Sequence, residues 1–315
     1  MAVMNEWMGA AKSRLWTLGM LGLDAFSNEQ ATRLMHQRKT RRRLDLRTPR
    51  RFDEKLQWLK LFHRDPLMAR CADKLGLHDY ASSRGQGAIL NDLLGVYRSV
   101  DEIDWEALPD AFVLKCNHGC GYNILVHDKS TLERRKASQD LSRWMTERYG
   151  RRKLEYHYDQ IVPRIFAERM LDSGGRDAPL DYKVYCFNGE PLVVLLCASD
   201  KGQTRYAYFD RDWGPLELMA AKVPIITDTA DLARPACLEP LLESARALAE
   251  PFAFVRVDFY IEHGRPVLGE MTFTPSANMD NGYSDEGLDY LGSLLRLPQE
   301  RPAGRSDGGK VAAPR

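Results

Sequence analysis

The chain has 315 residues, of which 44% are hydrophobic and 28% are charged, and its formal net charge is +1. This length allows more than one packed domain, and the composition is typical of globular proteins rather than disordered or fibrous ones. The near-zero net charge provides no general attraction to nucleic acid, so no nucleic-acid partner is expected. No apolar run reaches the roughly 18 residues of a membrane-spanning helix, so none is expected.

The cysteines and the N-terminus indicate a cytoplasmic protein. The six cysteines form no paired C-x-x-C ligand sets, which is typical of reduced thiols. Cys116, His118 and Cys120 would need a fourth ligand to bind zinc. The N-terminal LWTLGMLGL segment has no small-residue cleavage pattern after it. It predicts an amphipathic helix rather than a signal peptide.

A basic stretch from Arg38 to Arg51, RKTRRRLDLRTPRR, contains eight basic residues and one acid. One interpretation is a solvated helix face followed by a loop at Thr48-Pro49. The other is a patch for an anionic surface, such as the inner face of a membrane or a polyanionic glycan. No aromatic residues interleave with the charges, which argues against nucleic acid.

Hydrophobic spacing predicts amphipathic helices over 52–62 and 238–250 and an exposed helix over 130–150. A short helix is expected in CADKLGLHDY, from Cys71 to Tyr80, and residues 87–110 are expected to be a linker.

The segment FVLKCNHGCGYNILV, from Phe112 to Val126, predicts two strands joined by a loop that contains Gly119 and Gly121. Glycine lets backbone N–H groups approach phosphate oxygens, and Lys115 at the loop entrance can neutralise phosphate charge. The alternative is an ordinary hairpin turn.

Two further strand regions carry polar residues. The segment 161–171 predicts a buried strand with Glu168, which could hold a ribose hydroxyl or pair with Arg164 or Arg169. The segment 181–196 predicts a hairpin that turns at Asn188-Gly189 and places Lys183 on one face with its period-two neighbours.

The segment FVRVDFYIEHGRPVLGEMTFTPSAN predicts a hairpin around Gly264. Folded there, it places Asp258 opposite Glu270 and Arg256 opposite Thr272. Facing carboxylates repel unless a cation or a shared proton lies between them. Magnesium held by these acids and by nucleotide phosphates would satisfy them. The alternatives are two solvated acids, or Asp258 paired with an arginine.

Taken in order, seven segments make the chain from about Phe52 to Leu297 similar to the TupA-like branch of the ATP-grasp ligases: FDEKLQWLK, ADK, LPDAFVLKCNHG, DYKVYCFNGEP, YFDRDW, RVDFY and GEMTFTP. The last two also resemble a segment of the D-alanine–D-alanine ligases. The resemblance implies an α+β ATP-grasp fold, in which two α+β lobes clasp ATP and a helical extension precedes them.

The domain boundaries that follow are an N-terminal helical and basic extension over residues 1–50 and a pre-ATP-grasp-like region over 51–110. The lid lobe would span 111–170 and the catalytic lobe 171–297. The remaining residues, 298–315, are rich in proline, glycine, arginine and serine, and a disordered tail is expected there.

The resemblance also implies roles for individual residues. Lys115 would contact the α- and β-phosphates, Glu168 would lie at the adenine and ribose hinge, and Arg256 would lie beside the transferred phosphoryl group. The full ATP-binding set is Lys74, His78, Lys115, His118, Gly119, Gly121 and Glu168. The magnesium set is Asp258, Glu270 and Thr272, and the catalytic and substrate-pocket set is Lys183, Arg205 and Arg256.

Several positions depart from the family pattern. Thr272 replaces a frequent asparagine metal ligand, and His78 replaces an arginine or lysine that assists phosphate binding. A neutral histidine there would weaken ATP binding or make it pH dependent. Cys120 and Tyr122 stand where serine and glycine are common, which bears on lid flexibility.

The function implied is ATP- and magnesium-dependent ligation of a carboxylate to an amine through an acylphosphate. The substrates would be a uronic-acid-containing surface polysaccharide, or its precursor, and an amino acid or amine. Three alternatives remain: a kinase for a small molecule or sugar, a non-catalytic glycan- or partner-binding scaffold, and a glycosyltransferase with Asp210-Arg211-Asp212 as its D-x-D motif.

Overall fold

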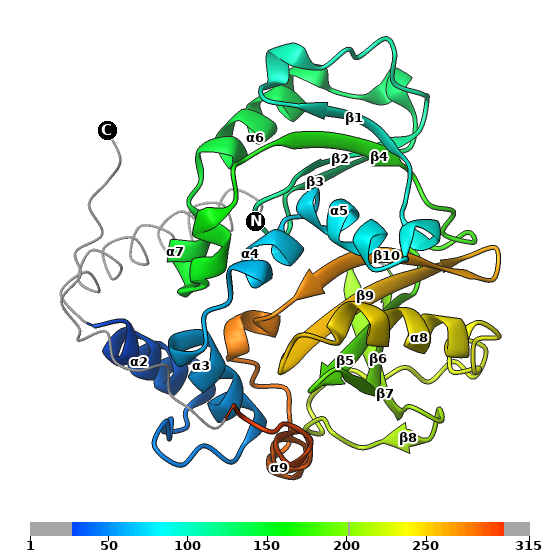
Figure 1. Ribbon diagram of the computed structural model, residues 1–315. Helices are drawn as coiled ribbons and strands as arrows, with labels where there is room; N and C mark the ends of the chain where they lie inside the picture. Colours follow the sequence, from blue (N-terminus) through cyan, green and yellow to red (C-terminus); the bar gives the residue numbers. More distant parts are fainter. Residues whose placement is uncertain (1–26, 201, 299–315) are drawn as a thin grey trace, which may run out of the picture.

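The computed structural model describes residues 27–200 and 202–298 (Figure 1). The predicted N-terminal amphipathic helix lies outside these residues, as does the predicted tail apart from residue 298. None of the helices within the described ranges combines the length and the apolarity that crossing a membrane requires.

Two antiparallel sheets form the framework. The smaller sheet has the strand order β1-β4-β2-β3, and the larger has the order β10-β9-β5-β6-β7-β8. The smaller sheet contains β1 (Leu93–Tyr97), β2 (Phe112–Cys116), β3 (Asn123–Val126) and β4 (Ile165–Arg169). The larger contains β5 (Asp181–Phe187), β6 (Glu190–Asp200), β7 (Gln203–Asp210), β8 (Pro215–Leu216), β9 (Phe254–Glu262) and β10 (Arg265–Thr272). In Figure 1 the smaller sheet lies above the larger one, with β10 at the edge nearest to it.

Two tight turns set the hairpins of the larger sheet. Asn188 and Gly189 have φ values of 52° and 86°, and His263 and Gly264 have values of 50° and 74°. Positive φ at both central residues is the requirement of the two-residue turn that matches strand twist. The predicted hairpins at these two places are therefore present.

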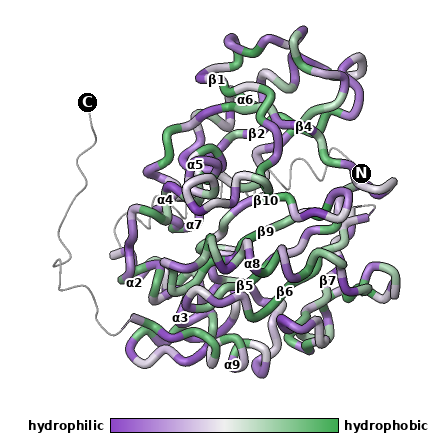
Figure 2. The backbone as a smooth tube through the Cα atoms, turned by 45° about the vertical axis from the view of Figure 1, so that its right-hand side comes forward, coloured by the Kyte–Doolittle hydropathy of each residue, from purple (hydrophilic) through white to green (hydrophobic). Residues whose placement is uncertain are grey.

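The helices of the described residues are α2 (Asn28–Thr40), α3 (Phe52–Phe62), α4 (Pro66–Ala72), α5 (Gly76–Ser83), α6 (Arg134–Thr146), α7 (Tyr149–Lys153), α8 (Leu238–Ala249) and α9 (Asp285–Leu294). The Ser27 side chain accepts the Gln30 backbone N–H, and the Gln30 side chain accepts the Ser27 backbone N–H. This pair of bonds is a capping box, and it starts α2. Short 3₁₀ turns include η4 (Tyr156–Gln160) and η5 (Pro275–Asn278). Figure 2 shows hydrophobic stretches along α8 and the strands beside it.

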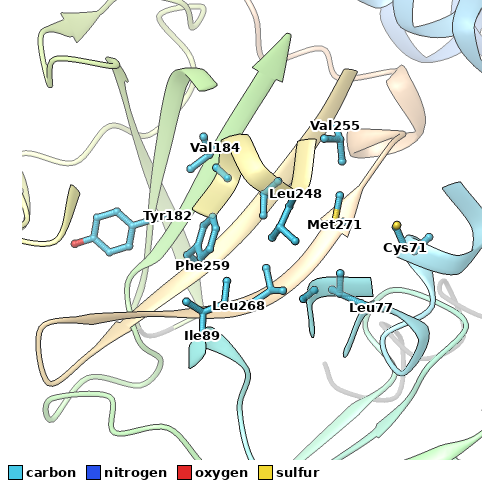
Figure 3. Packing of buried hydrophobic residues seen from close by; sticks show 14 of the residues in the cluster. Cys71, Leu77, Ile89, Tyr182, Val184, Leu248, Val255, Phe259, Leu268 and Met271 are labelled. Carbon is cyan, nitrogen blue, oxygen red and sulfur yellow. The ribbon is translucent and has the colours of Figure 1, made fainter. Parts of the chain in front are cut away.

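Alternation along the strands divides the larger sheet into two buried faces. On one face, Val184 of β5 and Phe259 of β9 point toward Leu248 of α8 (Figure 3). On the other face, Tyr185 and Phe254 pack against Phe52 of α3, with Phe52 and Phe254 ring centroids 5.3 Å apart. This second face is covered by α3 and α9 at one end only, so polar groups can line its other end.

Two sequence expectations for residues 71–110 were wrong. Residues 87–110 are not only a linker, because they contain β1, an edge strand whose half-exposed side chains give a weak hydrophobic pattern. CADKLGLHDY spans two helices rather than one. The Asp73 side chain accepts the Leu75 N–H at 3.0 Å, which ends α4 and places Lys74 in the break between the two helices.

Candidate functional site

The β9–β10 hairpin brings together the residues predicted to bind magnesium. Asp258 is paired with Glu270 and Arg256 with Thr272, as the sequence predicted. A β-bulge at Gly269 shifts the register between Leu268 and Glu270. The bulge adds one residue to β10, so that Glu270 and Thr272 share a face with Asp258 and Arg256.

The Arg256 guanidinium holds this face together. Its Nε and Nη2 donate to the two Asp258 carboxylate oxygens, each at 2.6 Å. Nη2 also lies 3.3 Å from Glu270 Oε1 and 3.2 Å from Thr272 Oγ1. The fork-on-carboxylate geometry is the strong form of this ion pair.

Strand β5 adds a second cation, since Lys183 is paired with Asp258 across β5 and β9. The Lys183 Nζ donates to Asp258 Oδ2 at 2.7 Å and to Asp181 Oδ2 at 2.5 Å. The cluster thus alternates carboxylates and cations, in the order Asp181, Lys183, Asp258, Arg256 and Glu270. Asp258 is thus paired with an arginine, which was one of the alternatives from the sequence.

These charges fix the protonation of the acids. Burial alone would raise the pKa of Glu270, but Lys74, Arg256 and Lys183 outweigh it and lower that pKa to about 2. Burial raises the pKa of Asp181 to about 6 despite the neighbouring Lys183. Glu270 is therefore a carboxylate at neutral pH, ready to bind a cation.

The donor set suits magnesium. Magnesium commonly takes one or two carboxylates and completes its shell with water and substrate phosphates. Asp258 and Glu270 supply the carboxylates and Thr272 a hydroxyl, all on one face. No cluster of three or more acidic, histidine or cysteine side chains suitable for a metal occurs within residues 27–200 and 202–298. Nucleotide phosphates would thus be needed to complete the shell, and the magnesium assignment remains a prediction.

The smaller sheet carries the predicted phosphate lysine. Lys115 on β2 forms an ion pair with Glu168 on β4. Glu168 therefore pairs with neither of the arginines considered from the sequence. Arg169 donates to Glu262 instead, at 2.7 Å.

His78 on α5 lies close to this pair. Burial lowers its pKa, and the charges of Glu168 and Lys115 also act on it. His78 is thus neutral at neutral pH, as considered from the sequence, and stands with two other predicted nucleotide residues.

The glycine loop is more closely packed than a phosphate-binding loop requires. His118 is 3% exposed, and its Nε2 donates to the Trp144 carbonyl at 3.1 Å. A Cβ at Gly119 would come within 2.6 Å of the Tyr122 ring. The structure therefore places His118 in the lobe core. The packing of the Tyr122 ring is by itself a sufficient reason for a glycine at position 119. Gly121 has a φ of 78°, which favours glycine directly.

Lys74 connects the two lobes. Its Nζ donates to the Gly119 carbonyl at 2.8 Å and lies 3.7 Å from Glu270 Oε2. It thus joins the glycine loop to the hairpin that carries the acids.

A cavity of about 550 Å³ adjoins the cluster and is lined by Lys183 and Arg256. Its other lining residues include Tyr185, Tyr206, Tyr208, Lys222, Ser276 and Asn281. Lys222 and Tyr206 were missed from the sequence, although Tyr206 and Tyr208 follow the same period-two alternation that places Lys183.

Arg205 was expected in this pocket, and the structure does not place it there. It is paired with Ala198, which belongs to the core on the α8 face. Because strand side chains alternate, Tyr206 and Lys183 share the cavity face, and Arg205 lies on the opposite one.

The family model described as TupA-like ATPgrasp matches residues 54–296. The chain belongs to the TupA-like ATP-grasp family. Its α+β fold of two lobes is the ATP-grasp fold that the sequence predicted. No curated protein matches the chain.

Solved structures show weaker similarity. D-alanine–D-alanine ligase from Bacillus anthracis is 14% identical with a TM-score of 0.41, covering 71% of this chain and 63% of that one. Its complex with ATP is 14% identical with a TM-score of 0.36, covering 64% of this chain and 53% of that one. D-cycloserine synthetase DcsG is 15% identical with a TM-score of 0.42, covering 73% and 71%. The chain thus spans about half to two thirds of the Bacillus ligase, and similarities of this size carry no argument about the reaction.

For this TupA-like protein, Lys115→Met should weaken ATP binding at least about tenfold, because the phosphates would lose a charge-assisted donor. Isothermal titration with ATP and magnesium measures the effect. Lys136→Met, which removes an exposed lysine of α6, is the matched control. Unchanged affinity in Lys115→Met would contradict the assignment of Lys115 to the nucleotide.

Proposed function

We propose that this protein is an ATP-dependent ligase that joins a carboxylate to an amine through an acylphosphate. Family membership supports ATP as the cosubstrate. The observation that carries the proposal is that Arg256 and Lys183 line a large cavity and also contact the carboxylates of Asp258 and Glu270. The wall of the cavity thus has cations for a carboxylate substrate, and the two acids that these cations contact are available for the metal of the nucleotide.

The residues have distinct roles in this proposal. Lys115 and Lys74 neutralise the phosphates, and Asp258 and Glu270 hold magnesium, which supplies charge neutralisation at the transferred phosphoryl group. Arg256 stabilises negative charge on the phosphoryl group and on the tetrahedral intermediate.

The proposed reaction has two steps, each of which forms one bond and breaks another. A carboxylate oxygen of the substrate attacks the γ-phosphorus, and ADP leaves. The amine nitrogen then attacks the acyl carbon, and inorganic phosphate leaves with the carboxylate oxygen while the amine loses a proton. Closure of the smaller sheet over the site excludes the water that would hydrolyse the acylphosphate.

The shape and charge of the cavity support a carboxylate-bearing saccharide as substrate. Tyrosine rings provide flat faces, and Lys183, Arg256 and Lys222 provide positive charge. A groove of about 590 Å³ shares Lys222 and Asn281 with this cavity. Its basic lining residues are Arg38, Lys39, Arg41, Arg42 and Lys222. We assign the groove to a polyanionic glycan rather than a membrane because it is concave and adjoins the cavity beside Lys183 and Arg256, which we call the catalytic cavity.

Oxygen transfer tests the reaction. With the uronic acid carboxylate labelled with ¹⁸O, the proposed reaction places one labelled oxygen in the released phosphate, and product formation requires an amine. A kinase would give ADP without an amine and no labelled inorganic phosphate. A shift in melting temperature with UDP-sugar alone would favour a glycosyltransferase, and no response to ATP with magnesium would favour a non-catalytic scaffold.

The proposed D-x-D motif has a structural role here. Asp210 Oδ1 accepts the N–H groups of Asp212 at 2.9 Å and Gly214 at 2.7 Å. The Asp210 carboxylate thus stabilises the turn after β7, which speaks against the glycosyltransferase alternative.

If the groove holds a glycan, the double variant Lys39→Glu, Arg41→Glu should raise the KM for a polyuronate about tenfold or more. Reversed charge would repel the anionic chain while leaving the cluster intact. The KM for a monomeric uronic acid should stay unchanged, which serves as the internal control. Equal effects on polymer and monomer would contradict the assignment.

A further inference from the structure

A second cavity, of about 120 Å³, lies between α3, the start of α4, η4 and the end of β10. It shares no lining residue with the catalytic cavity. Much of its wall is apolar, formed by Leu59, Met68, Phe252, Ala253, Phe254 and Phe273. It is therefore a separate hollow with its own chemistry.

Two buried polar groups line this cavity without partners. Lys60 and His157 are 6% and 8% exposed, and neither Lys60 Nζ nor His157 Nε2 has a hydrogen-bond partner among the described residues. Behind them, Glu155 accepts the Thr274 hydroxyl at 2.5 Å, while its other oxygen is unpartnered. An unsatisfied buried polar group is costly, so these groups need a partner from outside the chain.

The charges indicate what that partner is. Burial lowers the pKa of Lys60 to about 8, which still leaves it cationic at neutral pH. Burial and the charge of Lys60 lower the pKa of His157 to about 4, so its neutral ring can donate a proton from Nε2. Arg64 at the rim, 5.1 Å from the centre of the Tyr156 ring, adds positive charge. Asp65 also lines the cavity, but its Oδ1 accepts the Leu67 N–H at 2.8 Å and caps α4. The buried polar groups of the wall that are left without hydrogen-bond partners among the described residues are therefore donors, which match a carboxylate.

The size limits the rest of the ligand. One water occupies roughly 10–15 Å³ of such a cavity volume. At about 120 Å³, the cavity therefore accommodates a molecule of about ten non-hydrogen atoms. The aromatic and aliphatic wall would cover an apolar body.

We propose that this cavity binds a small carboxylate with an apolar body, whose carboxylate accepts from Lys60 and His157. The ligand would act as an effector, because Thr274 lines this cavity and Ser276 lines the catalytic one. The two residues are separated by Pro275 alone, and they begin a constrained loop in which Ser276, Ala277 and Asn278 all have positive φ. A ligand against Thr274 thus bears on a loop that lines the cavity beside Lys183 and Arg256.

Phenylacetate, with phenylacetamide as its neutral counterpart, tests the proposal at constant ionic strength. At ten times its Kd, phenylacetate should raise the melting temperature by about 2 °C, whereas phenylacetamide should not. Saturating ATP with magnesium should leave this shift in place, because the two cavities are separate.

Variants locate the effect. Lys60→Met removes the cation and keeps the length of the side chain, and Met68→Trp fills the cavity without a change in charge; both should abolish the shift. Lys136→Met on α6 should retain it. No shift in the native protein would mean that the cavity holds water only. An equal shift with the amide, persistence in Lys60→Met or displacement by ATP would each overturn the proposal.

Discussion

Replacing Glu270 by glutamine should lower the rate of magnesium-dependent ADP formation at least about 100-fold, because the site would lose one of its two facing carboxylates. The amide keeps the shape of the side chain and can still accept the Thr272 hydroxyl, which lies 3.0 Å from the Glu270 carboxylate. Glu270 is 29% exposed at its side chain, so the fold should tolerate the neutral group.

A coupled assay of ADP release over a series of magnesium concentrations measures this effect. The rate of Glu270→Gln should recover in part at high magnesium, since the remaining ligands bind the ion more weakly. The control is Glu239→Gln, which removes an exposed acid of α8 that pairs only with Arg234 among the described residues. Native rate and native magnesium dependence in Glu270→Gln would remove the metal assignment.

Replacing Arg256 by methionine should make the ligand-free protein respond to magnesium alone. In the native protein Arg256 neutralises Asp258 and reaches Glu270. Without it the cationic partners that remain among the described residues are Lys183 for Asp258 and Lys74 for Glu270, so the two acids repel each other more strongly. Breaking such a buried pair costs about 3–5 kcal/mol. A divalent ion between the carboxylates would restore part of this free energy of unfolding.

The melting temperature with magnesium chloride, against potassium chloride at equal ionic strength, measures the response. We expect a loss of about 10 °C in Arg256→Met, partly recovered by magnesium, and turnover reduced about 10²–10³-fold. Arg246→Met, which removes a half-buried arginine bound to Glu190, is the matched control and should not respond. The absence of any magnesium effect in Arg256→Met would show that the acids do not form an ion site.

The sequence correctly predicted that Asp258 and Glu270 face each other, but the simple hairpin about Gly264 from which this was predicted is not the register that the strands adopt. The turn at His263-Gly264 pairs Glu262 with Arg265. Continued without interruption, that register would place Asp258 opposite Gly269 and send Glu270 to the other face. The bulge at Gly269 restores the pairing, and the glycine inside a strand was its only marker in the sequence.

Other features depended on contacts that no local pattern encodes. The face that Arg205 occupies is set by its pairing with Ala198 of β6, which the resemblance that placed Arg205 in the pocket does not encode. The ion pair of Lys115 and Glu168 joins residues far apart in sequence, where several partners of opposite charge were available. The helices α3 and α8 were predictable because their apolar spacing is long and regular.

In the proposed reaction, Lys74 would make the release of product depend on both lobes. Its single ammonium binds the Gly119 carbonyl above and approaches Glu270 below. Separating the lobes requires this ammonium to leave one of the two, and the phosphates of an incoming nucleotide would compete with both for it. We therefore expect the opening of the site to be slowest when the nucleotide has gone and Lys74 again bridges the lobes. The empty enzyme would then rest partly closed, and the rate of nucleotide entry, rather than affinity alone, would depend on one lysine in the break between α4 and α5.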